Sequence, residues 1–214
     1  SGSLAAAHGS YTVRGSGSLG GTADAGHFAY QSVTKDGNVA ARITSLSGGT
    51  GGVMLRAGTG ASDAFAAVTI VPGQGAVFTA RTATGGAATS SAAVPAGTQP
   101  WVKLVRNGNL VSGYVSETGA EGSWRLVGTA GVALPRVALG GLVAGSAAGV
   151  ATATFSNVTA ASTVPVGANI DFLTDWSLAN AFVDVVKQAR GFTSLATNQP
   201  ARTDAAGWPT EDFY

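Results

Sequence analysis

Short apolar runs rich in valine, threonine and aromatic residues fill the sequence between residues 11 and 160. Examples are HFAYQSV, AFAAVTIV, AVFTART, WVKLVRN and ATATFSNVTA. Such residues favour the half-buried surface of a pleated strand, and no helical spacing of apolar positions separates the runs. About ten such strands at short spacing are typical of all-β folds. We therefore expect an antiparallel jelly roll or β-sandwich over 11–160.

Gly-rich turn signals separate these runs, among them KDGN, PGQG and TGAEGS. The strongest is RNGN, residues 106–109, which places Asn-Gly between two apolar runs. Asn-Gly is favoured in type I′ turns because both central residues need a positive φ. The motif therefore predicts a β-hairpin at this point.

The pattern changes after residue 160, where 161–168 reads as a linker. NIDFL then predicts a strand, and Ser177 and Gly191 can start and stop a helix. The helical spacing is carried by Leu178, Phe182, Val185, Val186 and Ala189. We expect residues 169–214 to be a strand-helix extension of the sandwich or a truncated second domain.

The composition limits which binding partners and which cellular location we expect for this protein. Charged residues make up 11% of the 214 residues and the net charge is +1. Nucleic-acid-binding domains, by contrast, are usually strongly basic and carry clusters of lysine and arginine. No apolar run reaches about 18 residues, and the lack of cysteine excludes thiolate chemistry. We expect no nucleic-acid or membrane partner, and a secreted or cell-surface location. The opening SGSLAAAHGS, residues 1–10, predicts a flexible N-terminus or a cloning remnant.

The blocks GTADAGHFAYQSVTKDGNVAARITSL, GVMLRAG, GQGAVFTARTATGG and WVKLVRNGNLVSGYVSETGAEGSWRLVG resemble the concanavalin A-like β-sandwich module of secreted bacterial proteins. The resemblance covers residues 11–160. It implies a lectin-type jelly roll that serves as an accessory module of carbohydrate-active enzymes. The segment 169–214 more weakly resembles the start of a second domain of exported, glycoside-hydrolase-like proteins.

Four arginines lie on or at the ends of predicted strands: Arg42, Arg56, Arg81 and Arg106. Like charges on neighbouring strands repel, so such a ladder needs carboxylates, aromatic faces or an external ligand. Guanidinium forks suit carboxylates and sugar hydroxyls, which predicts a shallow face for a polysaccharide, uronates included. The alternative is that the stems cover the sheet and the heads pair with nearby acids. Those acids are Asp24, Asp36, Asp63, Glu117 and Glu121.

The large aromatics of 11–160 are Tyr30, Trp101, Tyr114 and Trp124. Tyr114 is the best candidate for an exposed aromatic that stacks on a sugar ring, and the alternative is that Trp101 and Trp124 cover the edge of the core. Asp24 and Asp36 lie in loops and could hold a structural calcium ion through hard oxygen ligands. The alternative for Asp36 is a turn-forming side chain. We expect no other cofactor.

Enzyme signatures are weak. No predicted strand carries two carboxylates spaced for glycoside hydrolysis, and no G-x-S-x-G motif occurs. The sequence therefore predicts a noncatalytic carbohydrate-recognition module. Two alternatives stay open: a structural subunit of an extracellular assembly that associates through its C-terminal extension, and the N-terminal fragment of a glycoside hydrolase.

Overall fold

The computed structural model describes residues 2–162, 202–203 and 209–210. The chain divides into two units, Ser1–Pro165 and Val166–Tyr214. In the second unit β13 (Arg202–Thr203) pairs with β14 (Pro209–Thr210). Ala161 and Ser162 of the predicted linker belong to the last strand of the first unit. The rest of the linker and the predicted helix lie outside the described residues. In the described part of the chain, no helix has the length and apolar character needed to cross a membrane.

All regular structure in residues 2–162 is β-strand, and every pairing in it is antiparallel, which confirms the all-β prediction. The first six strands are β1 (Gly2–Ala7), β2 (Ser10–Gly17), β3 (His27–Thr34), β4 (Gly37–Ser47), β5 (Thr50–Arg56) and β6 (Phe65–Val71). The remaining six are β7 (Gly75–Arg81), β8 (Thr89–Ser90), β9 (Trp101–Asn107), β10 (Leu110–Ser116), β11 (Arg125–Gly131) and β12 (Val137–Ser162).

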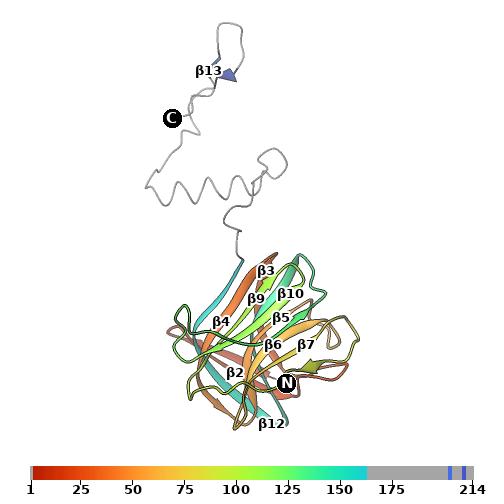
Figure 1. Cartoon of the computed structure of the whole chain (residues 1–214), viewed down its shortest axis with the longest axis vertical. Helices are drawn as coiled ribbons and strands as arrows, with labels where there is room; N and C mark the ends of the chain where they lie inside the picture. The colour runs from red at the N-terminus through yellow and green to blue at the C-terminus, as the bar shows by residue number, and fades with distance from the viewer. Residues whose placement is uncertain (1, 163–201, 204–208, 211–214) are drawn as a thin grey trace. The chain divides into compact units, whose positions relative to one another are not determined.

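The long strand β12 runs through both halves of one curled sheet (Figure 1). Its first part pairs with β3 and β5, and its second part pairs with β2 and β4. Two layers result. We call the strands β1-β2-β12-β4-β9-β10-β11 layer A, and β3-β12-β5-β6-β7-β8 layer B.

The main core lies between these layers. Alternate residues of each strand point inward, as in Val39, Ala41 and Ile43 of β4 and Val53 and Leu55 of β5. This alternation follows from the two-residue period of a strand. The other faces of the strands therefore carry the residues that are free to form a site.

Phe78 of β7 fills the core beneath two glycines of layer A. A Cβ at Gly113 would come within 2.6 Å of the Phe78 ring, and one at Gly128 within 2.8 Å. Such distances are below any ordinary van der Waals contact, so the ring takes the space that a side chain would need.

Two hairpins differ from the sequence prediction. The RNGN hairpin forms, but Asn107 pairs with Leu110 and only Gly108 of the two central residues has a positive φ (62°). That pattern matches a type II′ turn, which takes glycine first.

The expected flexible N-terminus is instead the strand β1, paired with β2 from Gly2–Gly15 to Ala7–Ser10. His8 and Gly9 between them both have positive φ (49° and 78°), as a type I′ turn requires.

Candidate functional site

Three side chains form a row across the outer face of layer B. Arg56 of β5 pairs with Phe65 of β6, and Phe65 pairs with Arg81 of β7. The guanidinium carbons of Arg56 and Arg81 lie 5.7 and 4.9 Å from the centroid of the Phe65 ring. The buried aromatic therefore separates two cations and attracts both through its π-face.

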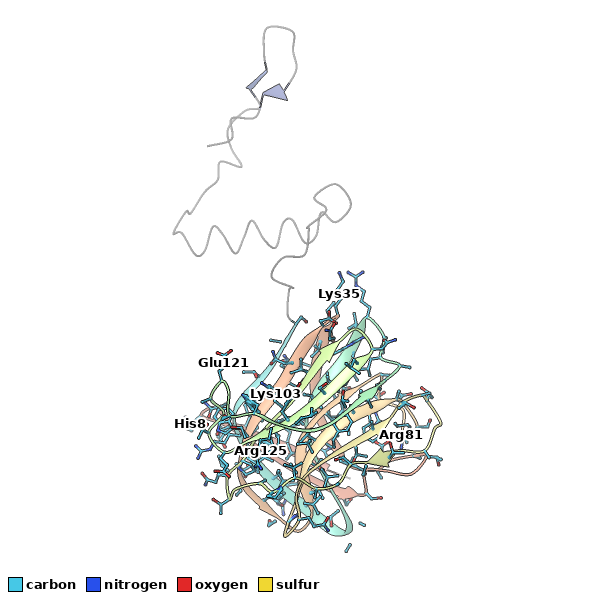
Figure 2. The ribbon with its side chains drawn as sticks, in the orientation of Figure 1. His8, Lys35, Arg81, Lys103, Glu121 and Arg125 are labelled. Carbon is cyan, nitrogen blue, oxygen red and sulfur yellow. The ribbon has the colours of Figure 1, made fainter. Side chains whose placement is uncertain are left out.

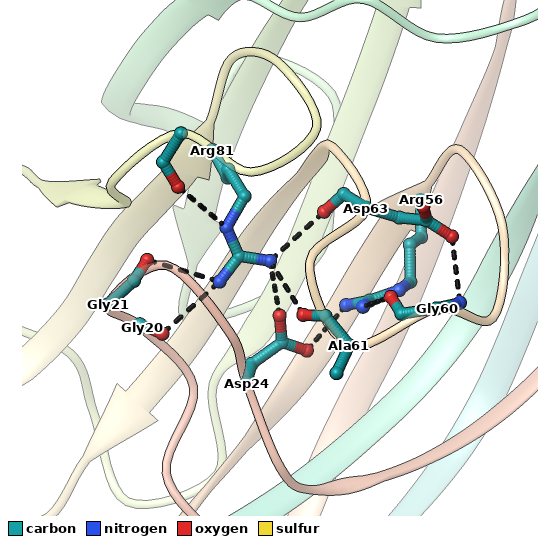
Figure 3. A network of polar contacts seen from close by, with 9 residues as sticks. Gly20, Gly21, Asp24, Arg56, Gly60, Ala61, Asp63 and Arg81 are labelled. Carbon is teal, nitrogen blue, oxygen red and sulfur yellow. Dashed lines mark hydrogen bonds and ion pairs between the residues drawn. The ribbon is translucent and has the colours of Figure 1, made fainter.

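Asp24 joins the two ends of this row (Figure 3). Its Oδ1 accepts from Arg81 Nη1 and its Oδ2 from Arg56 Nη1, each at 2.5 Å. The Asp24 side chain is 6% exposed. Like-charge repulsion between the arginines is thus relieved by an internal carboxylate, as the second interpretation of the arginine ladder predicts.

Arg81 is completely buried and donates from all three of its nitrogens. Its carbonyl acceptors lie in three loops (Figure 3). They are Gly20 and Gly21 between β2 and β3, Ala61 and Asp63 between β5 and β6, and Gly86 between β7 and β8. Arg81 therefore holds three loops together and has no face open to a ligand, so its predicted contact with a polysaccharide is wrong.

Arg56 differs from Arg81 although it is only 4% exposed. Its Nη1 donates to Asp24 and its Nη2 to the Gly60 carbonyl. Arg56 also lines a pocket of about 280 Å³ on the outer face of layer B. Other residues of this pocket are Asp24, His27, Phe28, Tyr30 and Met54.

Tyr30 gives this pocket, which we call the Tyr30 pocket, an aromatic wall. The Tyr30 ring stacks on Phe28 with a centroid distance of 5.2 Å, yet 52% of the residue is exposed. Phe28 in turn packs on the small cluster of Met54, Phe65, Ala67 and Val143 beneath it. The pocket thus has an apolar floor and a polar end at Arg56.

The other two predicted arginines lie elsewhere. Arg42 is on the outer face of layer A, where its Nη2 donates to Gln99 at 2.8 Å. Arg106 points to the rim of the core and donates to the carbonyls of Gly108, Leu134 and Pro135. Burial lowers the pKa of Arg106, and the charge of Asp36 partly offsets this. The four arginines therefore do not share one face.

Tyr114 of β10 lies on the outer face of layer A beside Lys103, and Figure 2 shows Lys103 away from Arg81. Lys103 Nζ is 5.5 Å from the Tyr114 ring centroid and 4.0 Å from that of Trp124. Burial lowers the pKa of Lys103, while Glu121 acts in the opposite direction. A cation of the protein itself therefore already occupies the face of Tyr114.

The geometry does not support calcium at the two predicted aspartates. Asp24 precedes β3 and has both oxygens paired with arginine. Asp36 follows β3 at the opposite end, and its Oδ1 accepts from the Gly108 amide. In the part of the chain that the structure describes, no three acidic, histidine or cysteine residues gather as ligands. Asp36 lies in the bend between β3 and β4, and its side chain bonds to the turn between β9 and β10, a contact that neither interpretation predicts.

From the sequence alone, Tyr30 ranks below Tyr114 among the aromatics, and His27 and Phe28 are not assigned to a site. Alternation within HFAYQSV marks Phe28 and Tyr30 as neighbours on one face of a strand. The local pattern does not show which strand lies beside this one, because β3 pairs with β12, more than a hundred residues later in the chain.

No protein-family model matches the sequence, and no curated protein matches it. Among solved structures, the chain is similar to a functionally unknown protein from Saccharomyces cerevisiae. The two share 19% identity with a TM-score of 0.59, over 76% of this chain and 92% of that chain. This likeness shows a shared fold.

Two further matches have lower TM-scores. One is the carbohydrate-binding module CBM66 from Bacillus subtilis, with 19% identity and a TM-score of 0.47 over 75% of this chain and 91% of that chain. The other is xylan β-1,4-xylosidase from Bacillus halodurans C-125, with 12% identity and a TM-score of 0.49, over 72% of this chain and 37% of that chain.

Proposed function

We propose that the unit containing residues 2–162 is a noncatalytic carbohydrate-recognition module that binds a sugar in the Tyr30 pocket. The observation that carries the proposal is a half-exposed tyrosine stacked on Phe28 at the wall of a pocket that ends at Arg56. Small-molecule sites combine an apolar lining with a few fixed polar groups. A sugar ring needs both, because its C–H face is apolar and its rim is hydroxylated.

The acidic content of the pocket supports sugar binding and not sugar hydrolysis. Glycoside hydrolysis needs two carboxylates on either side of the scissile bond. Among the residues that line the Tyr30 pocket, the one acid is Asp24, and both of its oxygens accept from arginine. The low charge of the chain further supports a place in a secreted or cell-surface protein, where such a module would act as an accessory to an enzyme.

The test is retention on a panel of insoluble neutral and acidic polysaccharides. Wild type should be retained on at least one polysaccharide. Tyr30→Ala should lose retention because it removes the stacking wall, while its exposed position leaves the core intact. Tyr114→Ala is the matched control on layer A and should be retained like wild type. Failure of wild type to bind any member, or equal retention of Tyr30→Ala, would overturn the proposal.

A further inference from the structure

The two arginines of the row differ in how many of their donors are used. A guanidinium has five N–H groups. Arg81 directs its nitrogens to six acceptors, so all of its donors are used. Arg56 makes two hydrogen bonds to the described residues, to Asp24 and Gly60. Three of its donors therefore have no partner in the described part of the chain.

One of these donors, the Nε–H group, is not sealed in the core. Within the described residues, Arg42 Nε is the one side-chain nitrogen or oxygen that is both buried and without a partner. The unpartnered Nε of Arg56 is therefore not sealed in the core. Because Arg56 is a lining residue of the Tyr30 pocket, that pocket is where its remaining donors can meet a ligand.

At the polar end of the pocket, one carboxylate is shared between two cations. The buried row holds two guanidiniums, and a single carboxylate, Asp24, pairs with both. Asp63 lies nearby and keeps its negative charge, with its Oδ2 accepting from the Gly60 amide, but it does not line the pocket. Asp24 is the one acid among the described residues of the lining, beside His27 and Tyr30.

We propose that the Tyr30 pocket selects acidic sugars, with the carboxylate of a uronic acid unit on the free N–H groups of Arg56 and the sugar ring against Tyr30. This inference rests on the proposed carbohydrate-recognition function. Guanidinium pairs with carboxylate through parallel charged hydrogen bonds, which are stronger than hydrogen bonds to a neutral hydroxyl. A volume of about 280 Å³ is at the lower end of small-molecule sites, so the pocket suits one or two sugar units.

The experiment is an NMR titration of the full chain with glucuronate and galacturonate, and in parallel with glucose, galactose and acetate. We expect the uronates to shift the amide signals of His27 and Tyr30, with dissociation constants about tenfold lower than those of the neutral sugars. Added salt should weaken the uronates and leave the neutral sugars unchanged, because only the charged pair is screened.

Two variants of Arg56 test the role of its fork. Arg56→Gln should remove the preference for uronates. Arg56→Lys keeps the charge but loses the planar fork, and should retain only part of the preference. Unchanged amide signals from layer A establish that each variant is folded. Arg125→Gln, on the exposed part of layer A, is the matched control and should bind uronates like wild type.

The other outcomes separate this inference from the proposed function. Equal, salt-independent binding of uronates and neutral sugars at Tyr30 would overturn the uronate selection and leave carbohydrate recognition in place. Acetate binding as tightly as the uronates would show that the site binds carboxylates without contacting the sugar ring, and would overturn the proposed carbohydrate recognition. Absence of shifts at Tyr30 with every ligand would overturn both.

Discussion

At the scale of single residues, Arg81 shows how a charged side chain can be an organiser of structure. Burying a guanidinium is costly unless its donors are satisfied and its charge is paired. Arg81 meets both conditions through Asp24 and five carbonyl oxygens from three loops. The same contacts fix Asp24, and Asp24 fixes Arg56 at the end of the Tyr30 pocket. The pocket therefore depends on a residue that no ligand touches.

Replacement of Arg81 by methionine should be strongly destabilising. It leaves five carbonyls without this donor and breaks a buried ion pair, a change that typically costs about 3–5 kcal/mol. Urea unfolding followed by tryptophan fluorescence measures the loss. Arg125→Met is the control, because Arg125 is exposed and makes one hydrogen bond, to the Pro95 carbonyl; it should change stability by about 0.5 kcal/mol or less. Similar losses in the two variants would contradict the organising role of Arg81.

At the scale of elements, the two layers approach closely where β10 and β11 cross Phe78. Gly113 and Gly128 allow this approach because they leave room for the aromatic ring. Gly131, on the same strand as Gly128, has open space around its Cβ position. Glycine is therefore required at one point of this hairpin and replaceable at another.

The substitution Gly113→Ala should destabilise the protein by about 1–3 kcal/mol, because the new methyl group overlaps Val68 and the Phe78 ring. Gly131→Ala should be neutral or slightly stabilising, since alanine restricts the unfolded chain more than glycine does. The midpoints of thermal unfolding of the two variants, each compared with wild type, measure these changes in stability. A neutral Gly113→Ala would mean that the layers can separate at this point without cost.

The sequence pattern predicts which residues of a strand point inward better than it predicts which strands are neighbours. Alternation in β5 correctly separates Val53 and Leu55 from Arg56. The meeting of Arg56 and Arg81 depends on β6, which places Phe65 between them. Arg106 looks equivalent in sequence but belongs to β9 in the other layer. The pairing of strands distant in the chain is set by packing of the whole molecule, which a local pattern does not contain.

At the scale of the whole molecule, residues 2–162 contain the strand partners that their sheet needs. Each of the strands β1 to β12 pairs within this range, and the main core is formed by residues from the same range. The predicted antiparallel fold over 11–160 is therefore confirmed in its strand content, and β1 extends it to the N-terminal residues. The expectations for residues 169–214 remain predictions.

A fragment that ends at Pro165 should fold on its own, because strands β1 to β12 find their partners within it and the residues of the described core belong to it. Its far-UV circular dichroism should be that of a β-protein, and its urea unfolding should be a single cooperative transition. A fragment that stays unfolded would show that residues 166–214 supply part of the core. Light scattering of the fragment and the full chain also tests the alternative of an assembly subunit, which expects association of the full chain alone.

The position of β12 has a consequence for the order in which the chain can fold during synthesis. Domains emerge from the ribosome with their N-terminal residues first. β2, β3, β4 and β5 all pair with β12, and β12 is the last strand of this unit to be made. Until residue 137 has been translated, those four strands lack their shared neighbour and the two layers are not joined. The nascent chain therefore reaches its native topology only when its final strand has left the ribosome.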